Sequence, residues 1–139
     1  EYNCRMGDPE TEVVMPRLET DLVSLFAAMD NGTLVDTNIE YNEGSFATVM
    51  AVSGGYPGDY QKNILINGLA ELAQQRESIV FHAGTKQEGD TIVTNGGRVL
   101  TVTSGAATIA DAVQQSTKIL QQISFEGMYF RNDIGYEFV

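Results

Sequence analysis

The hydrophobic pattern of this 139-residue chain changes its period along the sequence, and this change constrains the fold more than any other feature. Apolar residues first recur at helical spacing, up to about residue 32. Short runs rich in β-branched residues then alternate with glycine-containing turns, before one long helical stripe and a last strand-like run. The pattern thus gives two helices, then several strands joined by short turns, then one helix and one strand. This order predicts an α+β fold with antiparallel strands. The order does not fit an alternating βαβ fold.

Two helices are expected in the N-terminal part. In the first, Asp8 is the expected N-cap, Pro9 suits the first helical position, and Pro16 bends or ends the helix. In the second, Thr20 is the expected cap and the Asn31–Gly32 pair is a stop signal. The apolar side of the second helix consists of Leu22, Leu25, Phe26 and Met29.

The middle of the chain is expected to form strands. Residues 45–53 are apolar or small on both faces, which predicts a buried strand, and residues 98–103 are a second run of β-branched residues. Residues 86–90 have the composition of a hairpin turn. Thr108 is expected to cap the last helix, whose apolar stripe runs from residue 109 to residue 123. Further short strands are expected at residues 1–4, 64–66, 79–83, 92–93 and 125–130.

The charge is strongly acidic, with 8 basic and 19 acidic residues and a formal net charge of −11. A positive stripe for nucleic acid or anionic lipid is therefore not expected, and no apolar run is long enough to span a bilayer. Ten acidic and two basic residues fall within residues 1–43. This acidic part is interpreted either as a solvated face or as a surface that faces cations or a cationic partner.

The numbers of cysteine and histidine residues exclude two kinds of stabilising site. Cys4 is the one cysteine and His82 the one histidine, so an internal disulfide and a zinc site built from these residue types are excluded. A reducing, cytoplasmic setting is the plain interpretation. Cys4 is expected to be buried, and the methionines Met15, Met29 and Met50 and the Phe and Tyr residues are expected to fill the core.

Glu1 and Asn3 are candidate metal ligands. Two residues apart on a strand, their side chains point the same way. A carboxylate and an amide oxygen on one face are hard ligands that suit magnesium, especially magnesium held partly by phosphates. The alternative is that both are exposed polar residues on an edge strand.

Arg5 and Asp8 are the second pair of candidates. Arg5 can hold a phosphate or a carboxylate with two hydrogen bonds, and Gly7 allows close approach of the backbone. The helix start after Asp8 favours an anion, although Asp8 and Glu10 oppose that effect. The alternative is an N-capped helix with Arg5 paired to one of the acidic residues.

Three further features each have a structural and a functional interpretation. The glycine-rich run 54–58 is a structural turn or a phosphate-binding loop, but it lacks the Lys-Ser/Thr ending of a P-loop. The run 95–98 is a tight turn, or Arg98 contacts an anion there. His82, in an apolar strand, is a hydrogen-bonded structural residue or a base.

Together these segments resemble the phosphoribosylamine–glycine ligase family, also called glycinamide ribonucleotide synthetases, which are ATP-grasp enzymes of purine synthesis. The resemblance covers nearly the whole chain and corresponds to the C-terminal portion of that family. Met6 stands where an aromatic residue is usual, and residues 33–44 and 71–78 match poorly. The motifs that carry the resemblance are, in order, EYNCRMGDPETE, SGGYPGDY, VFHAGTK, VTNGGRVLTVT and FEGMYFRNDIG.

The resemblance implies an activity for a complete enzyme. Such an enzyme forms a C–N bond between glycine and 5-phosphoribosylamine with conversion of ATP to ADP and phosphate, the second step of de novo purine biosynthesis. The glycine carboxylate becomes an acyl phosphate, which the amine attacks. Magnesium, or manganese, bridges the ATP phosphates. Glu1 and Asn3 fall on the family's metal-ligand positions, which places Arg5 as an anion contact and Asp8 as a positioning group beside the phosphoryl-transfer centre.

The resemblance also implies a division of the chain. Residues 1–32 correspond to the end of an ATP-grasp domain, and residues 33–139 to a small antiparallel, barrel-sandwich-like β domain with one long helix. The expected partners are the rest of the parent chain and the three substrates, and the fragment alone is expected to be inactive. Dimerisation through exposed Val13, Leu18, Leu22 and Phe26 is a further hypothesis. The alternatives are a stand-alone, non-catalytic binding or structural module with the same fold and a related ATP-grasp carboxylase-type enzyme, which the Gly-Asp-Pro-Glu run argues against.

Overall fold

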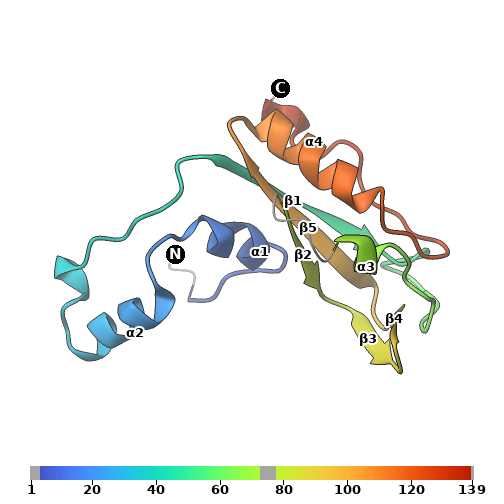
Figure 1. Cartoon of the computed structure of the whole chain (residues 1–139), viewed down its shortest axis with the longest axis horizontal. Helices are drawn as coiled ribbons and strands as arrows, with labels where there is room; N and C mark the ends of the chain where they lie inside the picture. The colour runs from blue at the N-terminus through green and yellow to red at the C-terminus, as the bar shows by residue number, and fades with distance from the viewer. Residues whose placement is uncertain (1–3, 73–77, 139) are drawn as a thin grey trace.

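A three-stranded antiparallel sheet forms the centre of the structure, a computed structural model that describes residues 4–72 and 78–138. The strands β1 (Ser45–Val52), β5 (Arg98–Ala106) and β2 (Ser78–His82) lie side by side in the order β1-β5-β2 (Figure 1). A separate hairpin of β3 (Thr85–Glu88) and β4 (Thr91–Thr94) follows at one end of the sheet. The antiparallel pairing and the α+β class agree with the expectation from the sequence.

The central strand β5 is buried on both faces, as its β-branched composition predicts. Ser104 bonds to Ser116 of the last helix, α4 (Ile109–Leu120), whereas Thr103 bonds to the backbone of Glu12. Because successive side chains of a strand point to opposite faces, Leu100 and Val102 share the α4 side with Ser104, and Thr101 shares the other side with Thr103.

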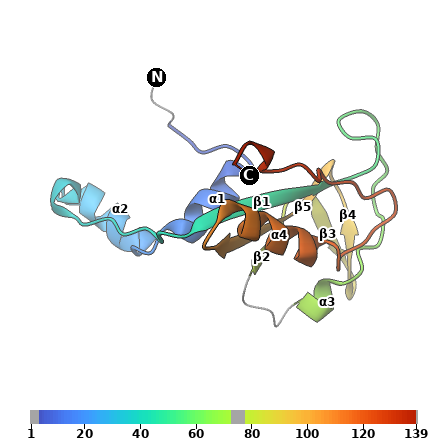
Figure 2. The same ribbon diagram turned by 90° about the horizontal axis from the view of Figure 1, so that it is seen from above.

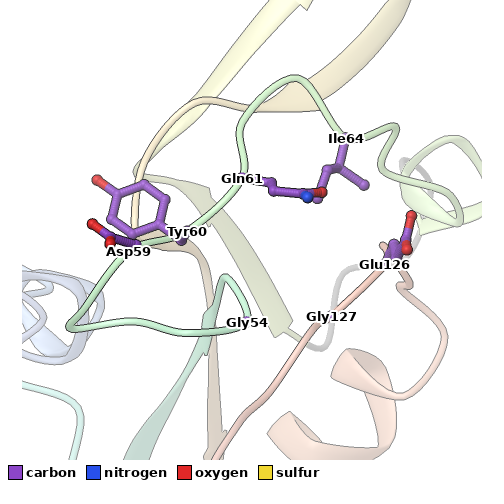
Figure 3. A pocket seen from close by; sticks show the side chains of 7 residues that line it. All are labelled: Gly54, Asp59, Tyr60, Gln61, Ile64, Glu126 and Gly127. Carbon is purple, nitrogen blue, oxygen red and sulfur yellow. The ribbon is translucent and has the colours of Figure 1, made fainter.

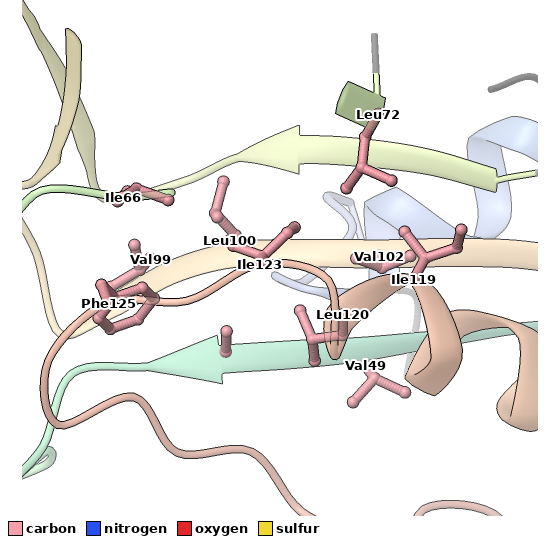
Figure 4. Close-up of a cluster of buried hydrophobic side chains, with 11 residues drawn as sticks. Val49, Ile66, Leu72, Val99, Leu100, Val102, Ile119, Leu120, Ile123 and Phe125 are labelled. Atoms are coloured by element: carbon pink, nitrogen blue, oxygen red, sulfur yellow. The ribbon is translucent and has the colours of Figure 1, made fainter. Parts of the chain in front are cut away.

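The hydrophobic core lies between the sheet and α4 (Figure 4). Leu100 and Leu120 are fully buried there. The Thr108 side chain caps α4 by accepting a 3.1 Å hydrogen bond from the amide of Asp111, which confirms the predicted helix start. The core cluster consists of Val49, Ala51, Ile66, Leu72, Val99, Leu100, Val102, Ile119, Leu120, Ile123 and Phe125.

The N-terminal part consists of short helices on the opposite side of the sheet from α4 (Figures 1 and 2). The helix α1 (Glu10–Val14) continues into a 3₁₀ turn, η1 (Met15–Arg17), which contains Pro16, as predicted. The helix α2 (Leu22–Asp30) and the 3₁₀ turn η2 (Leu34–Asp36) extend away from the sheet (Figure 1).

Both predicted caps of the N-terminal helices are wrong. Pro9, not Asp8, occupies the N-cap position of α1, and α1 has no side-chain cap bond. Asp21, not Thr20, caps α2, because the hydroxyl of Thr20 accepts a 2.7 Å hydrogen bond from the amide of Glu40 instead. The predicted stop of α2 is confirmed, since Asn31 is the C-cap and Gly32 has a φ of +68°.

Some predicted strands are also corrected. Residues 125–130 form no strand, because a turn at Gly127 leaves a single antiparallel bridge between Tyr129 and Val52. Residues 64–66 likewise make only the bridge of Leu65 with Val93. Of the predicted strand 1–4, residues 1–3 lie outside the described residues, and Cys4 is in a bend. Three short helical elements were not expected: η2, α3 (Leu69–Leu72) and η3 (Tyr136–Phe138).

Burial differs from the expectation at several side chains. Cys4 is exposed, and Met29 and Phe26 are 60% and 57% exposed. Five other aromatic residues that were expected in the core are also exposed: Tyr41, Tyr56, Tyr129, Tyr136 and Phe138. The two α2 residues are exposed because α2 projects away from the sheet (Figure 1). Within the described residues, every helix is too short or too polar to cross a membrane.

Candidate functional site

The segment that contains the candidates Arg5 and Asp8 lies against the start of β5. The Arg98 guanidinium donates a 2.8 Å hydrogen bond from Nη1 to the main-chain carbonyl of Asp8. Its Nη2 lies 3.1 Å from the Asp8 carboxylate oxygen Oδ2. Of the two interpretations of run 95–98, the structure supports an anion contact of Arg98 inside the chain, with Asp8 as the anion.

Glu10 organises the turn before α1 in place of Asp8. The amide of Gly7 donates a 2.7 Å hydrogen bond to the Glu10 carboxylate. The carbonyl of Gly7 accepts bonds from the amide of Thr11 at 3.0 Å and from its hydroxyl at 2.7 Å. The Asp8 side chain therefore binds Arg98 rather than capping the helix.

Arg5 is exposed on the same segment, three residues before Asp8. Its Nη1 donates a long hydrogen bond, 3.4 Å, to the carbonyl of Met6. Arg5 also makes a further interaction in addition to this one. The candidate metal ligands Glu1 and Asn3 lie outside the described residues. Residues 4–72 and 78–138 contain no cluster of three or more Asp, Glu, His or Cys side chains that could hold a metal ion by themselves.

Two glycine-rich runs that were singled out separately in the sequence lie side by side. Ser53 donates from its amide to the carbonyl of Gly97 at 2.8 Å and from its hydroxyl to the carbonyl of Gly96 at 2.9 Å. The Tyr56 ring lies so close to Gly97 that a Cβ atom there would overlap with it. The loop after β1 and the turn before β5 thus form one unit, from which Arg98 projects to Asp8.

The loop 54–58 is a structural turn. The amide of Tyr56 donates to the carbonyl of Ser53 at 3.1 Å, and that of Gly58 donates to the carbonyl of Gly55 at 2.8 Å, so these two amides already have acceptors. A cavity of about 440 Å³ next to the loop has two acidic residues, Asp59 and Glu126, in its lining (Figure 3). Acidic side chains repel a phosphate, so this cavity does not support the phosphate-loop interpretation.

His82 has the surroundings of a structural residue. Its Nδ1 atom lies 2.9 Å from the hydroxyl of Thr85, and the side chain is exposed at the end of β2. This contact links β2 to the first residue of β3. The geometry supports the structural interpretation of His82 over a role as a base.

Glu12 and its contacts were missed by the sequence analysis. The carbonyl of Glu12 accepts a 2.9 Å hydrogen bond from the hydroxyl of Thr103. The Glu12 carboxylate oxygen Oε2 and the Thr101 hydroxyl are buried without a hydrogen-bond partner in the described part of the chain. Thr101 and Thr103, at alternate positions of β5, could have indicated this contact from the sequence. Hydroxyls on one face of a buried strand require polar partners from another part of the chain.

A second exposed ion pair lies in the C-terminal segment. Arg131 contacts Asp133 through Nε–Oδ1 at 2.8 Å and Nη2–Oδ2 at 2.9 Å. These hydrogen bonds lower the pKa of Asp133 and raise that of Arg131. Arg131, but not Asp133, is in the lining of an apolar cavity of about 240 Å³, together with Tyr56 and Tyr129. Because both partners belong to one short segment, the pair provides a useful comparison with Asp8 and Arg98.

Comparison with known proteins places the chain in a family. The family model described as "Phosphoribosylglycinamide synthetase, C domain" matches residues 46–137, from β1 through α4 to the C-terminal 3₁₀ turn. The chain belongs to this family. The membership confirms the resemblance inferred from the sequence motifs, and the matched region contains the sheet, α4 and Arg98.

Relatives of this C-domain family also align with the N-terminal part of the chain. The phosphoribosylamine–glycine ligase of Vibrio cholerae is 46% identical over 138 residues, which cover 98% of this chain and 32% of the relative. The bifunctional purine biosynthetic protein purD of Dictyostelium discoideum is 48% identical over 136 residues, 97% of this chain and 17% of that protein. The chain thus spans a third or less of the length of these relatives.

A solved structure supports the fold. The crystal structure of the phosphoribosylamine–glycine ligase from Thermotoga maritima aligns with a TM-score of 0.70 and 29% identity. The alignment covers 96% of this chain and 32% of that chain. The mixed arrangement of α-helices and antiparallel sheets is therefore that of the C-terminal region of this enzyme.

Proposed function

We propose that this chain is the C-terminal part of an ATP-dependent ligase that joins glycine to 5-phosphoribosylamine in the cytoplasm, with release of ADP and phosphate. The observation that carries the proposal is the alignment of proteins named phosphoribosylamine–glycine ligase over 97% or more of the chain, including the segment with Arg5 and Asp8. In this function the glycine carboxylate is phosphorylated by ATP. The amine of 5-phosphoribosylamine then displaces the phosphate to form the amide.

Residues 1–32 are proposed to complete an ATP-grasp domain, and residues 33–139 to form a barrel-sandwich-like β domain. The contrast between the projecting α2 and the sheet packed under α4 supports the division (Figure 1). The antiparallel bridge between Leu18 and Tyr41 and the contact of Arg98 with Asp8 join the two parts.

Glu1 and Asn3 are proposed as ligands of Mg²⁺ or Mn²⁺ held together with ATP. A carboxylate and an amide oxygen fit a hard cation whose other ligands are phosphate oxygens and water. Two such donors do not make a complete site by themselves, so the donor set agrees with a metal that arrives with the nucleotide. When bound, the metal neutralises the charge of the phosphates.

Arg5 and Asp8 have different proposed roles. The exposed Arg5 is an anion contact, since a guanidinium matches the geometry of phosphate and carboxylate oxygens. Asp8 is a positioning group, because its carboxylate and its carbonyl are both bound by Arg98. Asp8 therefore maintains the path of the segment rather than contacting a substrate.

The exposed apolar side of α2 is proposed to pack against the part of the parent polypeptide that this chain does not include. Val23, Phe26 and Met29 are 71%, 57% and 60% exposed. The ligase relatives are about three times as long as the aligned segment, so they contain further chain that could cover such a surface. A dimer of the isolated chain through α2 is the alternative outcome, which small-angle scattering of the chain distinguishes.

The test of the proposed function compares the complete polypeptide with the 139-residue chain. We expect ADP formation that depends on glycine and freshly generated 5-phosphoribosylamine for the complete polypeptide, and none for the chain alone. In the complete polypeptide, Glu1→Gln is expected to raise the Mg²⁺ requirement, whereas Glu43→Gln, an exposed control in the same acidic part, is not. Absence of glycine-dependent turnover in the complete polypeptide contradicts the proposal.

A further inference from the structure

We propose that Arg98 is a positioning residue that fixes the segment carrying Arg5 and Asp8 onto the C-domain sheet, and thereby influences the affinity of the proposed metal–ATP site for metal–ATP. The inference rests on the proposed function, because Glu1 and Asn3 precede this segment in the sequence. It assigns a role to a β5 residue that itself is not expected to touch a substrate.

The first support is the form of the contact. An exposed ion pair between two side chains orients the backbone weakly, because both side chains can rotate. Arg98 also binds the main-chain carbonyl of Asp8, at 2.8 Å, in addition to the carboxylate at 3.1 Å. One planar guanidinium thus holds two atoms of the same residue, which restricts both the position and the direction of the peptide there.

The second support is the rigidity of the base from which Arg98 extends. The carbonyl of Arg98 accepts a 2.8 Å hydrogen bond from the amide of Gly84. The preceding carbonyl, that of Gly97, accepts one from Ser53, and the Tyr56 ring covers Gly97. The backbone of Arg98 is therefore connected to the loop after β1 and to the β2–β3 connection.

The third support is a second contact between the same two parts of the chain. Thr103, five residues further along β5, donates a 2.9 Å hydrogen bond to the carbonyl of Glu12. The peptide from Asp8 to Glu12 is thus held at both of its ends by β5. Two separate attachment points define an orientation, whereas one would leave the segment free to pivot.

The expected effect follows from this arrangement. Loss of the Arg98 contacts releases the Asp8 end while the Glu12 end stays attached. Mutation of an outer-shell residue that hydrogen-bonds a metal ligand typically lowers metal affinity by about 10- to 100-fold. Arg98 acts less directly, through the segment it holds, so the low end of this range is expected. We expect Arg98→Gln to weaken Mn²⁺–ATP binding to the complete polypeptide by about tenfold. The measurement is water-proton relaxation enhancement without glycine, so that no turnover occurs.

The chain offers a graded series and a matched control. Arg98→Lys keeps the charge but cannot reach both acceptors in the plane of a guanidinium, so a smaller loss is expected. Asp8→Asn removes the charge and leaves the carbonyl contact, and its effect should also be intermediate. Arg131→Gln is the control, because it breaks an exposed ion pair of 2.8 Å whose partner lies only two residues away.

Hydrogen exchange tests the attachment independently of activity. In the complete polypeptide, Arg98→Gln should speed amide exchange in peptides covering residues 5–14, and Arg131→Gln should not. Unchanged exchange, or faster exchange with unchanged Mn²⁺–ATP affinity, overturns the positioning role. Failure of the proposed function gives a different result: the complete polypeptide then makes no glycinamide product, whatever the exchange of residues 5–14.

Discussion

The hydroxyl of Thr103 donates a 2.9 Å hydrogen bond to the main-chain carbonyl of Glu12, a residue ninety-one positions earlier in the sequence. The same hydroxyl lies 2.8 Å from that of Thr48 on the neighbouring strand β1. Because a hydroxyl has one proton, Thr48 must donate to Thr103. This pair of contacts attaches α1 to the sheet, and the next threonine on the same face, Thr101, has no comparable partner among the described residues.

The two threonines should respond oppositely to replacement by valine, which has the same shape. Thr103→Val leaves the Glu12 carbonyl without its donor and should lower the free energy of unfolding by about 1–2 kcal/mol. Thr101→Val removes a buried hydroxyl that has no partner and should leave the free energy of unfolding unchanged or raise it by up to about 1 kcal/mol. Urea unfolding of both variants measures the difference, and equal losses would show that the hydroxyl contacts do not determine the stability of this face.

A row of buried serines should be sensitive to Ser116→Ala. Ser116 donates to the carbonyl of Ala47 at 3.0 Å and lies 2.9 Å from the hydroxyl of Ser104, which lies 2.6 Å from that of Ser78. The alanine removes the donor to the Ala47 carbonyl and one of the two hydroxyl partners of Ser104, so the free energy of unfolding should fall by about 1–3 kcal/mol. Ser124→Ala, at an exposed position, is the control and should change it by less than about 0.5 kcal/mol. An equal, small effect of both variants would contradict the interpretation.

Gly97→Ala should destabilise the chain through the Tyr56 ring. A methyl group at Gly97 overlaps with this ring, so the free energy of unfolding should fall by about 1–3 kcal/mol. Truncation of the ring in Tyr56→Ala should remove most of that extra cost, which a double-mutant cycle measured by denaturant unfolding detects. Additive effects of the two substitutions would mean that the loss at Gly97 has another origin.

The start of α2 should depend on pH through Asp21. The amide and hydroxyl of Ser24 donate to the Asp21 carboxylate and lower the pKa of Asp21. A pKa lower in the folded than in the unfolded chain means that the charged cap stabilises the helix above the unfolded value of about 3.9. This stabilisation is lost as the pH falls through the folded value.

Amide hydrogen exchange of residues 22–25 measured against pH tests this dependence. Asp21→Asn keeps a capping oxygen without a titrating group, so its exchange should lack the acid-dependent component. Asp30→Asn, at the other end of α2, should retain it. Loss of the acid-dependent component in both variants would show that Asp21 is not its source.

Local sequence patterns correctly predicted the elements whose burial and hydrogen bonds are indicated by neighbouring residues alone. Residues 45–53 were expected as a buried strand, and β1 occupies Ser45–Val52, because apolar side chains on both faces require cover on both faces. The Thr108 cap of α4 was also expected, since a cap and its acceptor lie within one turn. Local sequence could not show whether Thr20 or Asp21 caps α2. The Thr20 hydroxyl accepts a hydrogen bond from the amide of Glu40, which is distant in the sequence.

The sequence by itself determined the α+β class, the family and the segments from which the candidate residues come, because periodicity and short motifs are local properties. Only the tertiary structure decided what Asp8 and Arg98 do. Each has a reasonable local role, as a helix cap and as an anion contact, and nothing between residues 8 and 98 indicates that they meet. The antiparallel sheet brings the start of β5 beside the segment before α1, and there the carboxylate is bound by the guanidinium.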